Sequence, residues 1–208
     1  VDETNGMTLF DGGYDRALSG ITCFKQYAVA CGREGGIPRV WVMKYDNNDD
    51  SINTCSSKVC NFDQLTFDET AYDVGLGSHY EYDTSDLVIG YDSLITPLST
   101  LKIDMSHDSM NEGERVVLKS KAVPGYNKDE YGCDRITVKS RDGTTDIPIS
   151  LVYRKDVMEQ HLHEGVPIPT HLYGYGSYGA CMEASFRATR LPLLDRGMVY
   201  IIAHVRGG

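Results

Sequence analysis

The chain has 208 residues, of which 41% are hydrophobic and 24% charged, a composition that is typical of a folded globular protein and excludes a disordered one. Its formal net charge of −10 argues against a nucleic-acid partner, because phosphate binding needs a basic surface, and it suits a cationic substrate better than an anionic one. No apolar run approaches the ~20 residues of a membrane-spanning helix, so we expect no membrane partner.

The first 120 residues read as short strands joined by polar turns. A strand is predicted over 21–30 and another over 39–45, with Glu34-Gly35-Gly36 as a hairpin-type break between them. No helical period occurs before about residue 155. Short strands of this kind indicate a sandwich, a barrel or a propeller, and the absence of a strict repeat leaves the choice open. Further strands are predicted at 62–67, 71–76, 87–91, 101–105 and 116–118.

A polar segment, 121–130, contains Pro124-Gly125 and is the candidate domain boundary. Beyond it, residues 135–140 and 147–153 alternate as two strands of a hairpin. Pro148 cannot donate to a ladder, so the second strand should have an edge position or an irregular start. The stretch 155–169 has no pattern that assigns a structure to it.

The last 40 residues change to an α/β pattern. An extended run at 168–171 leads into a loop, 172–179, in which tyrosines alternate with glycines. A helix is predicted over 186–196, with Ser185 as its cap, Gly197 at its end and Pro192 shortening or kinking it. Residues 198–205 are apolar on both faces, as in a buried strand. This order is typical of the start of a doubly wound α/β domain, and we expect the domain to be incomplete.

Few side chains offer catalytic chemistry by themselves. Ser177 lacks the Gly-x-Ser-x-Gly context of a nucleophile, because Tyr175 stands in place of the first glycine. His161-x-His163 reads as a solvated loop and His204 as a structural residue at a strand end. No metal-ligand set or phosphate-binding motif is present, so no cofactor is expected. The six cysteines are interpreted as free thiols of a reducing, cytoplasmic compartment, with a Cys55–Cys60 bridge as the alternative.

Several stretches, in the right order, are similar to the prolyl oligopeptidase family of serine peptidases. Residues 166–179, including 172–179, resemble its oxyanion-loop segment, and the Gly176-Ser177-Tyr178-Gly179 version resembles the oligopeptidase B subfamily. Further similarity is found at 140–156 with the first hydrolase-domain hairpin, at 190–197 with the first helix, at 203–208 with an Ala-x-x-Arg-Gly-Gly strand end, and at 81–84 and 91–97 with the last propeller blades.

The resemblance implies a β-propeller, of which only the C-terminal blades are present, followed by the start of an α/β-hydrolase domain. The implied parts are a partial propeller over 1–120, a linker over 121–131 and the N-terminal part of the catalytic domain over 132–208. The serine, aspartate and histidine of the family's triad would lie beyond Gly208. The chain alone is therefore expected to be an inactive fragment of a peptidase that cleaves short peptides, preferably after Arg or Lys.

The resemblance also implies residue roles. Tyr175 matches the tyrosine whose hydroxyl contributes to the oxyanion hole, and Tyr178 matches a position that lines the substrate pocket. Tyr173 is interpreted as a core residue, and Arg206 as a partner in an internal ion pair rather than a substrate contact. Two alternatives remain open: a peptidase that cleaves after proline, and a truncated, non-catalytic binding module of propeller type. The expected partners are short peptides, and the oligomeric state is not indicated.

Overall fold

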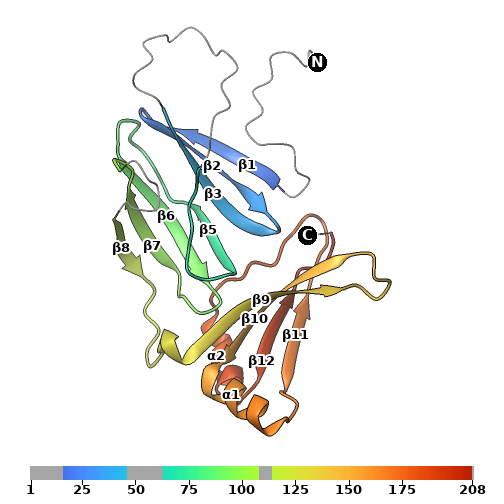
Figure 1. Cartoon of the computed structure of the whole chain (residues 1–208). Coiled ribbons are helices and arrows are strands. Elements are labelled where there is room, and N and C mark those ends of the chain that lie inside the picture. Colours follow the sequence, from blue (N-terminus) through green and yellow to red (C-terminus); the bar gives the residue numbers. More distant parts are fainter. Residues whose placement is uncertain (1–15, 46–62, 108–113, 208) are drawn as a thin grey trace. The chain divides into compact units, whose positions relative to one another are not determined.

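A computed structural model describes residues 16–45, 63–107 and 114–207, which form three four-stranded sheets (Figure 1). The chain divides into two compact units. The first comprises residues up to 66 together with 74–89 and 101–116, and the second comprises 67–73, 90–100 and 117–208. Within the described ranges, no helix is both long and apolar enough to cross a membrane.

The first sheet is a meander whose strands follow one another in chain order. Gly35 and Gly36 both have positive φ, at 57° and 77°, as a two-residue hairpin turn between β2 and β3 requires. The predicted break at these glycines is therefore confirmed. The bounds are β1 Arg16–Cys23, β2 Tyr27–Glu34, β3 Ile37–Lys44 and β4 Asp63–Gln64.

The single strand predicted over 21–30 is wrong, because the chain turns inside it. Phe24 N–H donates to the Tyr27 carbonyl at 2.8 Å, and the two rings stack with centroids 4.5 Å apart. Both side chains are almost fully buried. Because an apolar side chain stands on each side of the turn, the hydrophobic pattern of the sequence shows one continuous strand there.

The second sheet also has its strands in chain order, β5-β6-β7-β8. Each corresponds to a predicted strand, with ends that differ by a few residues. Of the strand predicted over 62–67, the described part begins at residue 63, and only the two residues of β4 are a strand. The bounds of this sheet are β5 Tyr72–Leu76, β6 Asp86–Ser93, β7 Ser99–Asp104 and β8 Arg115–Ser120.

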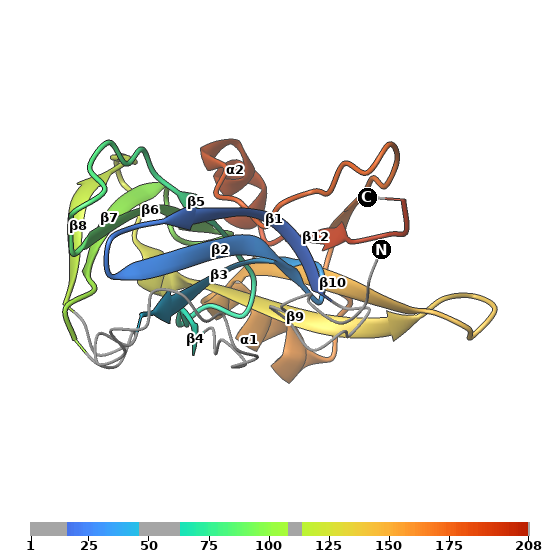
Figure 2. The ribbon, with the colours of Figure 1, turned by 90° about the horizontal axis from the view of Figure 1, so that it is seen from above.

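The third sheet is mixed, with the order β11-β12-β10-β9. β9 (Tyr131–Lys139) and β10 (Asp146–Arg154) form the predicted antiparallel hairpin, whose tip extends beyond the sheet (Figure 2). β12 (Val199–Ala203) runs antiparallel to β10 and parallel to β11 (Thr170–Gly174). β10 is thus not an edge strand, but its ladder to β12 begins only at Ile149, so Pro148 lies just outside that ladder.

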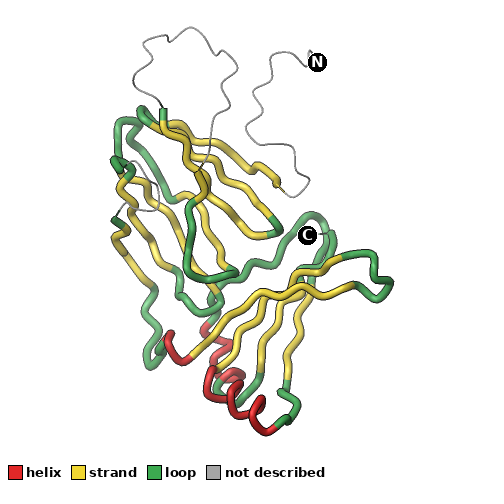
Figure 3. Tube along the Cα trace, viewed as in Figure 1, coloured by secondary structure: helices red, strands yellow, loops and turns green. Residues whose placement is uncertain are grey.

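The described helices all belong to the C-terminal part of the chain (Figure 3). The loop predicted at His161-x-His163 is wrong, because residues 155–164 form the helix α1 (Lys155–Glu164), which Gly165 ends at φ 65°. The helix predicted over 186–196 is reduced to a 3-10 turn, η2 (Ala188–Arg190), and the short α2 (Leu191–Leu194). Pro192 lies in the first turn of α2, where a missing N–H is harmless, so it marks a helix start rather than a kink. A further 3-10 turn is η1 (Lys128–Glu130).

Apolar side chains from β9, β10, β12 and α2 share one core in the second unit. β12 contributes less to it than predicted, because only Val199 and Ile202 are buried and Val205 is 37% exposed. Four cysteines, Cys23, Cys31, Cys133 and Cys181, are free thiols, as predicted. Cys55 and Cys60 lie outside the described residues. The core consists of Ala71, Leu94, Ile95, Tyr131, Val152, Ala184, Leu194 and Ile202.

Candidate active-site loop

The Gly-spaced tyrosine loop leaves the sheet at the carboxyl end of β11. The strand is longer than the predicted extended run and reaches Gly174, which lies opposite Ala203 at the end of the parallel strand β12. The carboxyl ends of parallel strands are where α/β sheets bind their ligands. Tyr175 is 40% exposed and Tyr178 98% exposed. Both phenol groups can therefore contact a bound molecule.

The turn after β12 holds this loop in place. Gly179 N–H donates to the Gly207 carbonyl at 3.0 Å. A Cβ atom on Gly176 would lie 2.5 Å from the Arg206 carbonyl oxygen and 2.7 Å from that of Val205. A Cβ atom on Gly207, whose φ is +96°, would lie 2.6 Å from the Gly176 carbonyl oxygen. The two backbones can approach this closely only because both positions are glycine.

Tyr178 has a left-handed backbone, with φ 57°, which no other described non-glycine residue shares. This conformation costs a bulky residue roughly 1–3 kcal/mol. The exposed ring gains no packing within the chain that would offset the cost. The bend is instead imposed by the hydrogen bonds of the loop, including Ala180 N–H to the Ser177 carbonyl at 3.0 Å. The loop thus presents an aromatic ring to solvent at an energetic cost.

Tyr173 lies on β11, directly before the loop. Tyr173 was interpreted as a core residue, and this is wrong: it is 39% exposed, because every residue of the edge strand β11 is exposed.

A buried serine contacts a histidine. Ser150, on β10, is fully buried, and its hydroxyl lies 2.8 Å from Nε2 of His204, just beyond β12. Nη1 of Arg135, on β9, donates to the same hydroxyl at 3.4 Å. A nucleophile must reach its substrate, and a serine with no exposed surface cannot. The pair is therefore a structural element at a strand end, as the sequence predicted for His204.

Arg206 lies near the β9–β10 turn. The pKa of Asp142 in that turn is lowered to about 2 by hydrogen bonds from Ser140 and Thr144, and the charge of Arg206 adds to the effect. The internal ion pair expected for Arg206 stays a prediction.

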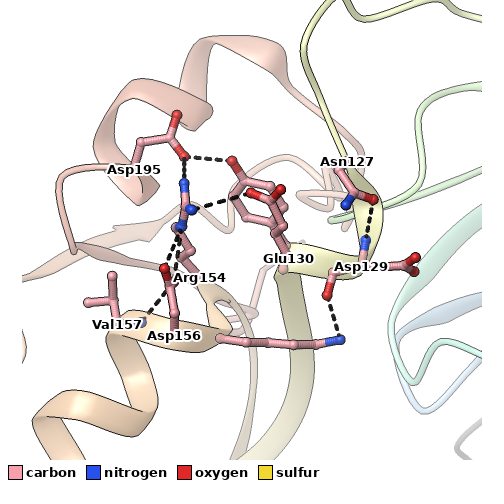
Figure 4. A network of polar contacts seen from close by, with 9 residues as sticks. Asn127, Asp129, Glu130, Arg154, Asp156, Val157 and Asp195 are labelled. Carbon is pink, nitrogen blue, oxygen red and sulfur yellow. Dashed lines mark hydrogen bonds and ion pairs between the residues drawn. The ribbon is translucent and has the colours of Figure 1, made fainter.

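Arg154 is the centre of an ionic network at the other end of the sheet (Figure 4). Its guanidinium lies 3.3 Å from Glu130, 3.0 Å from Asp156 and 3.3 Å from Asp195. The Tyr131 hydroxyl also donates to Asp195. Single exposed pairs contribute little, but a guanidinium shared by three carboxylates fixes the ends of β10 and α2 and the start of β9. This cluster supports the scaffold of the loop.

Glu69 is a buried carboxylate with a full set of donors. Its side chain is 7% exposed and accepts hydrogen bonds from the Tyr91 and Thr96 hydroxyls and from Lys128 Nζ at 2.7 Å. Burial by itself would raise the pKa of Glu69, but the hydrogen bonds from Lys128, Thr96 and Tyr91 outweigh it and lower the pKa.

Asp92, at the end of β6, is a buried carboxylate without such a set. It is 9% exposed, and its Oδ1 has no hydrogen-bond partner among the described residues. Burial, followed by the charge of Asp73, raises the pKa of Asp92 to about 7. The Phe186 N–H and the charges of Arg187 and Arg190 act in the opposite direction. The sequence alone does not identify either buried acid: Glu69 follows Asp68 in a polar stretch, and Asp92 is a single carboxylate in the mostly apolar run 87–95.

The match that shows the family lies within the first 116 residues. The family model for the prolyl oligopeptidase N-terminal β-propeller domain matches residues 7–116, more than half of the chain. The chain belongs to the prolyl oligopeptidase family. The two meander sheets at β1–β4 and β5–β8 are therefore propeller-type sheets, as the resemblance implied.

Similar proteins agree with this assignment. A dipeptidyl aminopeptidase BI from Pseudoxanthomonas mexicana is 37% identical over 93% of this chain and 24% of its own length. Protease 2 from Moraxella lacunata is 31% identical over the whole chain and 26% of its own length. The structure of oligopeptidase B from Trypanosoma brucei with covalently bound antipain has a TM-score of 0.77 at 36% identity and covers 96% of this chain and 26% of its own. The chain thus spans about a quarter of the length of these relatives.

Proposed function

We propose that these 208 residues belong to a serine oligopeptidase in which residues up to about 120 form propeller blades and residues from about 132 begin an α/β-hydrolase domain. The observation that carries the proposal is the loop 174–180 at the carboxyl end of the parallel strands β11 and β12. A mixed sheet with such a loop is the arrangement that an acyl-transfer site needs, because it holds donors at a fixed place outside the sheet.

Within this site, Tyr175 donates its hydroxyl to the oxyanion that forms when a nucleophile attacks the peptide carbonyl. Its neighbours Gly174 and Gly176 are both held against residues 203–206, so the backbone of Tyr175 is fixed before substrate binds. A preorganised donor stabilises charge that exists only in the transition state, and losing one costs roughly 10²–10³ in turnover. Tyr178, exposed beside it, contributes an aromatic wall of the substrate pocket.

The substrates are short peptides, cleaved after Arg or Lys. A net charge of −10 favours cationic substrates, and the solved structures similar to this chain include two of oligopeptidase B. The assay compares the turnover of peptides that differ only in Arg, Lys or Pro before the scissile bond, with the longest natural gene product that contains these residues. A preference for Pro by tenfold or more would replace this specificity with the post-proline alternative.

The 208-residue chain by itself has no peptidase activity, because no nucleophile is assigned in it. The purified chain should leave an Arg-containing peptide intact over hours at micromolar concentration. Turnover that is lost on Ser177→Ala would overturn this statement and make Ser177 the nucleophile.

A non-catalytic binding module is a second candidate, because the family match covers the propeller domain and ends at residue 116. In that case the chain would bind peptides without cleaving them, and the longest gene product would show the same behaviour. Binding of an Arg-containing peptide by the longest product, with no turnover, would favour this candidate.

A further inference from the structure

The turn that holds the tyrosine loop is itself anchored by one histidine. The His204 N–H donates to the Pro148 carbonyl at 2.9 Å, and the His204 ring reaches the buried Ser150 hydroxyl at 2.8 Å. Backbone and side chain of one residue are thus bound to β10 at two points. The next three residues, 205–207, are those against which Gly176 and Gly179 lie.

The Ser150 hydroxyl links two strands to the turn. A guanidinium can only donate, so Ser150 accepts from Arg135 at 3.4 Å. The same hydroxyl lies 2.8 Å from Nε2 of His204, and the direction of that bond depends on the tautomer of the ring. Because Ser150 has no exposed surface, water cannot replace a lost partner, and breaking the bond to His204 leaves the buried hydroxyl with only the 3.4 Å bond from Arg135.

We propose that His204 is a positioning residue for Tyr175: its hydrogen bond to Ser150 sets the 204–207 turn, and that turn sets the loop that carries the tyrosine. Tyr175 has Gly174 before it, opposite Ala203, and Gly176 after it, against Val205 and Arg206. A shift of the turn therefore displaces the residues on both sides of Tyr175, and Tyr175 moves with them. The effect of His204 on catalysis rests on the proposed function, but its effect on the position of the loop does not.

The link is tested in the 208-residue chain by amide hydrogen exchange measured by NMR. The reporter is the Gly179 N–H, which donates to the Gly207 carbonyl at 3.0 Å. Two variants of one histidine make a matched pair. The carboxamide in His204→Gln reaches as far as Nε2 and can accept from Ser150, whereas that in His204→Asn is one methylene shorter and cannot. His161→Asn, in α1, is the control at a histidine outside the turn.

Gly179 should exchange about tenfold faster in His204→Asn and in Ser150→Ala, the factor expected for one net hydrogen bond, and within threefold of wild type in His204→Gln and His161→Asn. The amides of β9 and β10 report general destabilisation of the same unit. Equal exchange at Gly179 in His204→Asn and His204→Gln would overturn the proposal, as would acceleration of the β9 and β10 amides by the same factor. If Ser150→Ala does not fold, the His204 pair still decides.

A kinetic measurement on the longest natural gene product separates this link from the proposed function. His204→Asn should lower kcat by tenfold or more and leave KM within about twofold, whereas His204→Gln should retain most of kcat. If Tyr175→Phe leaves turnover unchanged, the proposed function fails while the exchange result at Gly179 still stands. If Tyr175→Phe lowers turnover but the two His204 variants have equal kcat, the positioning role fails and the proposed function stands.

Discussion

Replacing Asp92 by asparagine should stabilise the chain at neutral pH. Oδ1 of this carboxylate has no hydrogen-bond partner among the described residues, and the side chain is only 9% exposed. Its pKa is raised from 3.8 to about 7, first by burial and then by the charge of Asp73. The charged form is therefore the unfavourable one in the folded chain, and an amide resembles the neutral form.

The sign and size of the effect follow from the two pKa values. Between pH 3.8 and 7 the unfolded chain has lost the Asp92 proton while the folded chain still binds it, so stability falls as pH rises through this window and is level above it. The full difference corresponds to about 4 kcal/mol. The amide must also place an NH₂ group in the cavity, so we expect Asp92→Asn to gain about 2 kcal/mol at pH 8.

The assay is urea unfolding followed by circular dichroism at pH 5, 6, 7 and 8. The gain in unfolding free energy from Asp92→Asn should grow from pH 5 to pH 7 and then stay constant. Asp142→Asn is the matched control, because hydrogen bonds lower the pKa of Asp142 to about 2 and its charged form is the favoured one. A variant at Asp92 that is less stable than wild type at pH 8, or a gain that does not change with pH, would refute the reasoning.

Three other changes test the scaffold. Glu69→Gln should cost about 1–3 kcal/mol at pH 7 and much less at pH 4, since the lowered pKa of Glu69 gives stability that is lost as pH falls; urea unfolding at both values checks this. Arg154→Met should lower the melting temperature by a few degrees and Arg154→Lys by less, and equal values would contradict a role for the shared guanidinium. Gly176→Ala should cost about 1–3 kcal/mol, because its Cβ would lie 2.5 Å from the Arg206 carbonyl oxygen; Gly174→Ala, whose Cβ comes no closer than 3.8 Å to any neighbour, should cost less.

The sheets were predictable because their signals are local. Alternating side chains identify β9 and β10, and the Gly35-Gly36 pair identifies a tight hairpin turn, since both residues need positive φ. The family resemblance rested on spacing that survives in single stretches such as 172–179. Each of these features depends on residues that are neighbours in the chain.

Some failures involve strands or side chains that are distant in sequence, and others involve a local signal that is too weak to recognise. The helix predicted over 186–196 begins later, at the turn Ala188–Arg190, and the Ser185 carbonyl accepts from the Arg190 side chain at 2.7 Å. Tyr173 is exposed because β11 is an edge strand, and the local sequence does not indicate that position in the sheet. The short helix α1 has a weak apolar face and was missed for that reason. The meeting of Ser150 with His204 could not be predicted, since 54 residues separate them.

The central claim is that Tyr175 is a preset oxyanion donor, and Tyr175→Phe in the longest natural gene product tests it most directly. Removing the hydroxyl should lower kcat for an Arg-containing peptide by roughly 10²–10³ with little change in KM. Tyr173→Phe, two residues earlier and similarly exposed, should leave kcat within about twofold. A decrease of less than threefold for Tyr175→Phe, or equal decreases for the two variants, would contradict the claim.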